Sequence, residues 1–317
     1  MFNNRKGIHI VCLKKDKFLY LLLYKLLVKS FYILFLLILI FFLSKSKIID
    51  NNEQKKSIFT FWEPQNNIPG YLRLCIKTWI KALPEYKLNI LDYKSVKKYL
   101  GENLFHKIIY EKLPLQTQTD AIRVALLKKY GGIWMDVDTI ITNGKFLQEL
   151  KKYELVMIGS TKTKSQHIGF ISALANSTVI NKWFNAIINK IKYYRQISND
   201  PKKSYILNKY CILGNRIVDH LLINATGKKY FRLDKYKMNA LPELNFSANS
   251  SLNASEKYRL FYFRKGQPEN ILNNLKGIIL LHNSWTPGMY KNMSEQEFLK
   301  EDILLSKLLG KILNYNI

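Results

Sequence analysis

Cysteine is scarce in this sequence. The chain has three cysteines, an odd number, with no C-x-x-C pair and no histidine at ligand spacing: Cys12, Cys75 and Cys211. This scarcity argues against a disulfide framework and against a zinc site as the basis of the fold. A single bridge between two of them stays open, but buried free thiols are the favoured interpretation.

Acidic residues are also few, with 23 Asp and Glu against 50 Lys and Arg, which leaves a formal net charge of +27. Such an excess attracts nucleic acid, anionic lipid or phosphorylated small molecules, and charge alone does not choose among them. The sequence lacks an arginine-rich arm, a zinc-finger spacing and an aromatic-basic RNA-binding signature. Nucleic acid is therefore not an expected partner.

Charge is missing altogether from an apolar run near the N-terminus, residues 31–43. A transmembrane helix needs about 20 apolar residues, a length that is reached when the helix starts at Leu26 and Lys29 extends its amine toward the interface. We therefore predict a basic N-terminal segment over residues 1–25 and a hydrophobic membrane-anchor helix over residues 26–43. The protein is expected to be membrane-associated, single-pass or monotopic, with membrane lipids as partners.

The rest of the chain supplies material for one packed domain, because 48% of all residues are hydrophobic and 13% are aromatic. We predict a polar linker over residues 44–56 and a single domain over residues 57–317. Its start reads as a strand, a helix and a second strand, over residues 57–62, 72–82 and 87–91, which predicts an α/β fold. Later α/β segments are predicted over residues 155–159, 181–194 and 216–224, and an amphipathic helix over residues 295–313.

A helix with two charged residues on one face is predicted over residues 117–130. Thr117 or Thr119 can cap its N-terminus, and apolar residues recur at helical spacing behind the cap. Asp120 and Arg123 are three residues apart and therefore share a face of this helix.

Two glycines, Gly131 and Gly132, end that helix, one of them in the left-handed conformation of a C-terminal cap. The following residues, 133–138, read as an apolar strand that closes on Asp136 and Asp138. Because side chains alternate along a strand, both carboxylates are expected to point the same way. Two neighbouring acids repel each other unless a divalent cation lies between them and a substrate diphosphate, so Mg²⁺ or Mn²⁺ is the expected ion.

This ordered set of helix, glycine pair and D-x-D strand resembles the core signature of the DXD sugar transferases of glycosyltransferase family 32. That family includes Golgi initiating mannosyltransferases and bacterial capsular polysaccharide synthesis proteins. The resemblance runs from about Ser57 to Trp285. Four further stretches are similar to the capsular polysaccharide branch: residues 59–64, 68–75, 91–93 and 281–285.

The resemblance implies a GT-A fold, a Rossmann-like domain that binds a nucleotide-sugar donor. It implies that Mn²⁺ or Mg²⁺ bridges the diphosphate and Asp138, and that Asp136 contacts the ribose or a metal-bound water. Asp120 and Arg123 would hydrogen-bond the donor sugar, and Trp62 would stack on the base.

The resemblance also assigns roles near the C-terminus, at the stretch His282-Asn283-Ser284-Trp285. His282 or Asn283 would complete the metal shell, while Ser284 and Trp285 would donate hydrogen bonds to phosphate oxygens. The implied reaction is metal-dependent transfer of a sugar to a glycan or lipid-linked acceptor, with retention of anomeric configuration. This reaction would serve surface polysaccharide or glycoconjugate synthesis.

Two other functions stay open at this point. In a haloacid-dehalogenase-like phosphatase, Asp136 would be a nucleophile, although such motifs normally follow the first strand and lead into Gly-Thr. In a basic membrane-surface protein, the lysine excess would bind anionic lipid and the acidic pair would have no role.

The side of the membrane that carries the domain is open as well. Lysines slightly favour a cytoplasmic N-terminus, which would place the domain outside, whereas bacterial sugar nucleotides are cytosolic. A monotopic anchor or a Golgi-type arrangement would remove the conflict.

Overall fold

The computed structural model divides the chain into two compact units, Met1–Asn52 and Glu53–Ile317. The boundary between them falls within the predicted linker. The structure describes residues 24–40, 57–150, 152–160, 165–209, 211–223, 229–235, 237–238, 251–267, 272 and 276–315.

In the first unit, residues 24–40 form a helix whose side chains are exposed. Among the described residues, no helix combines the length and the apolar character needed to span a bilayer. Residues 41–43 of the predicted anchor lie outside the described part of the chain. The anchor over residues 26–43 therefore stays a prediction.

The second unit is built on a six-stranded sheet with strand order β2-β1-β3-β6-β5-β7. β1 is parallel to both β2 and β3, β5 is parallel to β7, and β6 runs antiparallel to its two neighbours. This mixed sheet confirms the predicted α/β fold class. The strands are β1 (Ser57–Phe61), β2 (Lys87–Leu91), β3 (Gly132–Met135), β5 (Leu155–Gly159), β6 (Gln166–Ala173) and β7 (Phe231–Asp234).

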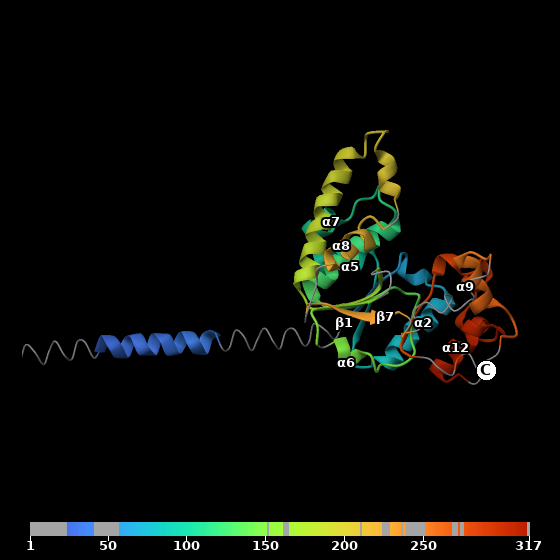
Figure 1. Cartoon of the computed structure of the whole chain (residues 1–317), viewed down its shortest axis with the longest axis horizontal. Coiled ribbons are helices and arrows are strands. Elements are labelled where there is room, and N and C mark those ends of the chain that lie inside the picture. Colours follow the sequence, from blue (N-terminus) through green and yellow to red (C-terminus); the bar gives the residue numbers. More distant parts are fainter. Residues whose placement is uncertain are drawn as a thin grey trace, which may run out of the picture. The chain divides into compact units, whose positions relative to one another are not determined.

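Helices cover both faces of this sheet (Figure 1), and each face has its own buried apolar cluster. One face carries α3 (Tyr93–Leu100), α4 (Glu102–Ile108), α5 (Leu115–Tyr130), α7 (Thr178–Ile197) and α8 (Asn215–Leu222). The other carries α2 (Gly70–Ala82), α9 (Ala254–Phe263), α10 (Gly288–Lys291), α11 (Glu295–Leu299) and α12 (Leu304–Leu313). Short helical turns, α6 (Leu147–Leu150), η1 (Gln65–Asn67) and η2 (Ser204–Asn208), connect these elements.

Alternation along β3 separates the two clusters. Ile133 and Met135 join the cluster that contains α2, whereas Trp134 joins the cluster that contains α5. The predicted alternation is therefore confirmed for β3, and it directs Trp134 toward the helix that carries Asp120 and Arg123.

The predicted start of that helix is wrong. α5 begins at Leu115, directly after Pro114, and no side chain caps it. The hydroxyl of Thr119 instead donates to the carbonyl of Leu115 inside the first turn. The position before Leu115 tolerates a proline, because the fixed φ of proline suits a helix start and no helical hydrogen bond there needs its missing N–H.

The helix ends at the predicted glycines, and both Gly131 and Gly132 have positive φ, at 65° and 96°. The ψ of Gly131 is −157°, so its backbone is not in the left-handed helical conformation that was expected of a cap. A Cβ on Gly131 would lie 2.7 Å from the backbone of Ala175, so close packing also requires glycine there.

The predicted strand end is wrong too, because β3 stops at Met135 and the two acids lie in a turn. The Thr139 N–H donates to the Asp136 carbonyl across this turn, at 3.0 Å, and the Asp136 N–H donates to Gly169 of β6, at 2.8 Å. The turn leads into β4 (Thr139–Ile141), which pairs antiparallel with β8 (Ile278–Leu280). This small second sheet brings the stretch after β8 beside Asp138.

The C-terminal helix predicted over residues 295–313 is broken into α11 and α12. Ile303 between them is extended, with φ −124° and ψ 153°, and forms an isolated bridge with Lys265. Phe298 and Leu305 are fully buried against the core that contains α2. This end of the chain therefore packs on the domain core.

Candidate functional site

A cavity of about 640 Å³ opens beyond the carboxyl ends of β1 and β3. Six chain segments line it: the end of β1, the N-terminal half of α5, the turn after β3, the start of β6, the stretch before α8, and the stretch after β8. Open α/β sheets bind ligands at this edge, since loops and helix N-termini converge there. The lining includes seven of the nine predicted site residues: Trp62, Asp120, Arg123, Asp136, Asp138, His282 and Asn283.

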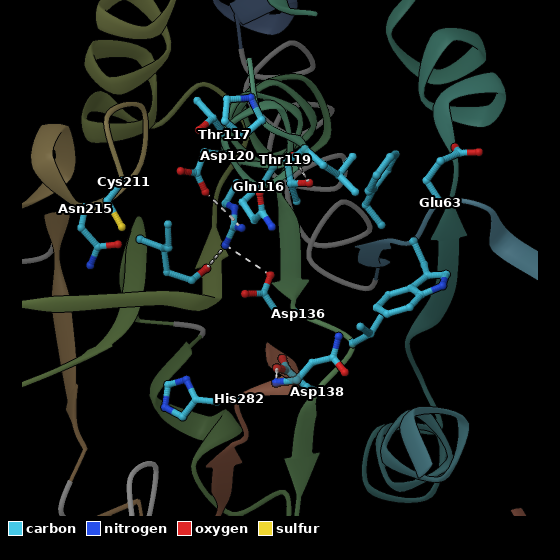
Figure 2. Close-up of a pocket in the computed structure, with 18 of the residues that line it drawn as sticks. Glu63, Gln116, Thr117, Thr119, Asp120, Asp136, Asp138, Cys211, Asn215 and His282 are labelled. Carbon is cyan, nitrogen blue, oxygen red and sulfur yellow. Dashed lines mark hydrogen bonds and ion pairs between the residues drawn. The ribbon is translucent and has the colours of Figure 1, made fainter. Parts of the chain in front are cut away.

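Arg123 joins two carboxylates in this cavity. Its Nη2 lies 3.2 Å from Oδ1 of Asp120, and its Nη1 lies 3.3 Å from Oδ1 of Asp136. Figure 2 shows both ion pairs as dashed lines that meet at one guanidinium, with Asp120 and Asp136 on different sides of it. The predicted shared face of Asp120 and Arg123 is therefore confirmed, and the ion pairs link it to the D-x-D turn.

The guanidinium is held by more than its ion pairs. Nη1 also donates to the carbonyl of Ile168 in β6, and the group lies over the ring of Trp134, 5.1 Å from its centroid. The indole N–H of Trp134 in turn donates to Oδ1 of Asp136, at 2.8 Å. Arg123 and Asp136 therefore have fixed positions before any ligand binds.

Burial sets the protonation of Asp120, which is 6% exposed. Burial raises the pKa of this carboxyl to about 7, although the Arg123 charge opposes the shift and the Asp136 charge adds to it. Gly214 packs so tightly on the carboxylate that a Cβ at this glycine would lie 2.5 Å from Oδ2 of Asp120. Near neutral pH the Asp120 carboxyl can thus accept a hydrogen bond from a hydroxyl when it is ionised, or donate one to a hydroxyl when it is protonated.

Replacing Asp120 with asparagine is expected to make stability less sensitive to pH. A carboxyl whose folded-state pKa is raised stabilises the fold below its unfolded pKa and loses that contribution as pH rises through the folded value. From about pH 4 to about pH 8 the wild type should lose roughly 2 to 4 kcal/mol relative to the variant. Denaturant unfolding with a chelator present measures this difference, and parallel pH profiles would contradict it.

Asp138 is tied to the stretch after β8. Its Oδ2 accepts the N–H of Asn283 at 2.9 Å, and its carbonyl accepts the N–H of Leu281 at 3.0 Å. The Tyr71 hydroxyl donates to the Asn283 side chain, and the His282 N–H donates to the Tyr258 hydroxyl at 3.2 Å. Burial and then the charge of Asp136 raise the pKa of Asp138.

The predicted C-terminal group divides in two. His282 and Asn283 line the cavity, whereas Ser284 is exposed and neither it nor Trp285 is part of the lining. The ring of Trp285 lies against the His282 ring, with centroids 3.9 Å apart. Trp285 therefore orients His282 in this structure. Trp62, after β1, also lines the cavity, and its indole N–H donates to the carbonyl of Asn67.

The sequence prediction missed other polar lining residues, among them His167 with its imidazole and Asn215 with its amide. His167 is the second residue of β6, some thirty positions after the acidic turn along the chain. One local signal was present, since a histidine stands near the start of a largely apolar strand, but only the sheet pairing of β6 with β3 places it beside Asp136.

The donor chemistry of the cavity fits a divalent cation. Two carboxylates and an imidazole, from Asp136, Asp138 and His282, face one cavity, and their oxygens and nitrogen suit Mg²⁺ or Mn²⁺. Burial and then the charge of Asp136 raise the pKa of Asp138, so a cation bound beside it would favour its ionised form. Among the residues that the structure describes, no three His, Cys, Asp or Glu side chains converge closely enough to hold a metal.

Similar solved structures are glycosyltransferases. PaToxG glycosyltransferase is 16% identical, with 57% of this chain and 75% of that chain covered at a TM-score of 0.34. Two structures of the glycosyltransferase GlyE from Streptococcus pneumoniae, one of them the apo form, are 12% and 13% identical and cover 82% of this chain at TM-scores of 0.37 and 0.38. The chain spans 64% and 65% of the GlyE chains.

None of the curated proteins matches the chain. A family model described as capsular polysaccharide synthesis protein matches residues 38–247, about two thirds of the chain. The match contains the end of β1, all of α5, the acidic turn and the start of β6, and so most of the cavity lining. The chain belongs to the capsular polysaccharide synthesis protein family.

Proposed function

We propose that this protein is a metal-dependent glycosyltransferase of the DXD type, similar to glycosyltransferase family 32 and built on a GT-A fold. It would transfer a sugar from a nucleotide-sugar to a glycan or lipid-linked acceptor, with retention, in surface polysaccharide synthesis. Membership of the capsular polysaccharide synthesis family supports a role in surface polysaccharide synthesis. The residues that line the cavity support sugar transfer as the reaction.

One observation carries the proposal. A single cavity holds a guanidinium clamped between Asp120 and Asp136, and beside it a third acid, Asp138, whose pKa is raised by burial. A nucleotide-sugar has the complementary parts, a hydroxyl-rich sugar and a diphosphate that brings a divalent cation. At about 640 Å³ the cavity lies within the usual range for small-molecule sites.

In this proposal the nucleoside lies at the Trp62 end and the sugar lies beside Asp120 and Arg123. The fixed guanidinium donates to sugar oxygens, and the Asp120 carboxyl accepts from or donates to hydroxyls. Asp138 and phosphate oxygens of the donor would hold Mn²⁺ or Mg²⁺ first, and Asp136 and His282 would complete the shell by moving closer when the donor binds, since the described residues do not bring three such groups together. When bound, the cation supplies positive charge beside the departing nucleoside diphosphate.

The walls of the cavity also orient the donor. Tyr71, Tyr258 and Asp138 fix the stretch 281–283 from three directions, so the groups that face the diphosphate need little reordering when it binds. Aromatic and apolar side chains of the lining, among them Phe61 and Leu115, would exclude water from the reacting bond. The role of a base or nucleophile is left unassigned.

A donor screen tests this proposal. Full-length protein, extracted from membranes with detergent, is incubated with UDP-, GDP-, CDP- and dTDP-sugars, and release of the nucleoside diphosphate is measured with Mn²⁺ and with EDTA. We expect release with one donor or a small group of donors, dependent on the cation. Folded protein that hydrolyses none of them would overturn the proposal. Recovery of the activity in a detergent-free soluble fraction would overturn attachment through residues 26–43.

A further inference from the structure

His167 lines the cavity but has no role in the proposal above. It stands near the start of β6, and its ring lies near that of His282, with centroids 6.3 Å apart at 63°. The next carbonyl along the chain, that of Ile168, accepts the hydrogen bond from Arg123. His167 therefore adjoins the guanidinium that the proposal places against the sugar.

The backbone fixes the tautomer of this histidine. The N–H of Gly169 donates to Nδ1 of His167, at 3.1 Å, so Nδ1 carries no proton. A neutral ring then has its proton on Nε2, where it is a hydrogen-bond donor. An Nδ1 that accepts from a backbone N–H cannot carry a proton, so the hydrogen bond itself requires the neutral ring, and burial, which lowers the pKa of His167, acts in the same direction.

The strand segment around this ring is held from several sides. Gln166 donates its N–H to Asp219 at 2.9 Å, accepts at its carbonyl from Asn215, and accepts at its side chain from the Tyr230 hydroxyl. A Cβ at Gly169 would lie 2.9 Å from Cε1 of His167 and 3.1 Å from Oδ2 of Asp136. Glycine thus lets the ring and the carboxylate approach the same point of the backbone.

We propose that His167 is a further sugar-binding residue, whose neutral Nε2–H donates a hydrogen bond to an oxygen of the sugar part of the donor. This inference rests on the proposed function and deepens it. A neutral imidazole N–H adds a hydrogen bond to one sugar oxygen, and because it has no charge it does not compete with Arg123 for the carboxylates of Asp120 and Asp136. The residue would therefore help select the sugar, while the nucleoside and diphosphate bind elsewhere.

Two substitutions separate this role from a structural one. His167→Gln places an amide N–H near the position of Nε2 but gives up the acceptor for Gly169, whereas His167→Asn keeps an acceptor near Nδ1 and gives up the distal donor. Both variants are assayed with the nucleotide-sugar identified in the screen. We expect kcat/KM to fall roughly tenfold in His167→Asn and to stay within about threefold in His167→Gln, as for one neutral hydrogen bond.

Binding of the nucleoside diphosphate alone, measured by calorimetry with Mn²⁺, should be the same in both variants and the wild type. A purely structural role predicts the reverse order of activities, with His167→Asn active and His167→Gln impaired, and that result would overturn the inference alone. Side-chain ¹⁵N NMR adds a test without substrate, because a proton on Nδ1 at neutral pH would also overturn it. A wild type inactive with every donor would instead overturn the proposed function.

Discussion

Asp138→Asn is expected to reduce sugar transfer roughly a thousandfold, because several kcal/mol of charge stabilisation at the leaving group depend on this carboxylate. The fold should be unaffected. An asparagine oxygen can still accept the Asn283 N–H that now bonds to Oδ2 of Asp138, so the stretch after β8 keeps its attachment. Removing a half-buried charge next to Asp136 also relieves repulsion, which should leave the free energy of unfolding equal or higher.

Asp200→Asn is the matched control for this substitution. Asp200 is a surface residue paired with Lys203 and has no place in the cavity, so the same chemical change there should leave activity unaltered. Donor hydrolysis and denaturant unfolding are measured on both variants. Retention of more than about a tenth of the wild-type rate in Asp138→Asn would contradict the leaving-group role, since no several-kcal/mol effect would remain.

The elements of the first α/β unit could be predicted because their signals are local. The alternation and aromatic content of residues 57–61, the helical spacing after Gly70 and the breaker Pro84 each depend on near neighbours in the chain. Asp120 and Arg123 were placed correctly on one helix face for the same reason, since residues three apart in a helix lie on the same face.

Features that depend on distant partners could not be predicted. The turn at Asp136 forms because Gly169 accepts its N–H, and the break near Ile303 forms where the chain bridges to Lys265. Helix and strand propensity contains no information about either partner. His167 was missed because its place beside Asp136 follows from the pairing of β6 with β3 and from a backbone hydrogen bond.

Arg123→Lys is expected to be the most damaging conservative substitution in the chain. One ammonium cannot replace a fork that meets Asp120, Asp136 and the Ile168 carbonyl while lying over the ring of Trp134. We expect a loss of about 3 kcal/mol in the free energy of unfolding, as when a buried pair is broken, and a loss of activity of at least about a hundredfold. Arg73→Lys is the control, because its ion pair with Glu295 is half-exposed and should contribute less than about 1 kcal/mol.

A double substitution then separates stability from chemistry. Arg123→Met alone leaves Asp120 buried without its cation, whereas Arg123→Met with Asp120→Asn removes the charge together with its partner. Without the Arg123 charge the pKa of Asp120 rises further above its unfolded value, so the buried carboxyl must take up a proton near pH 7, which costs free energy that asparagine avoids. The double variant should therefore be more stable than Arg123→Met by roughly 2 kcal/mol. Its activity should not recover, because both groups that would hold the sugar are gone. Recovery of transfer along with stability would show that the pair only supports the fold, and the sugar site would then have to lie elsewhere in the cavity.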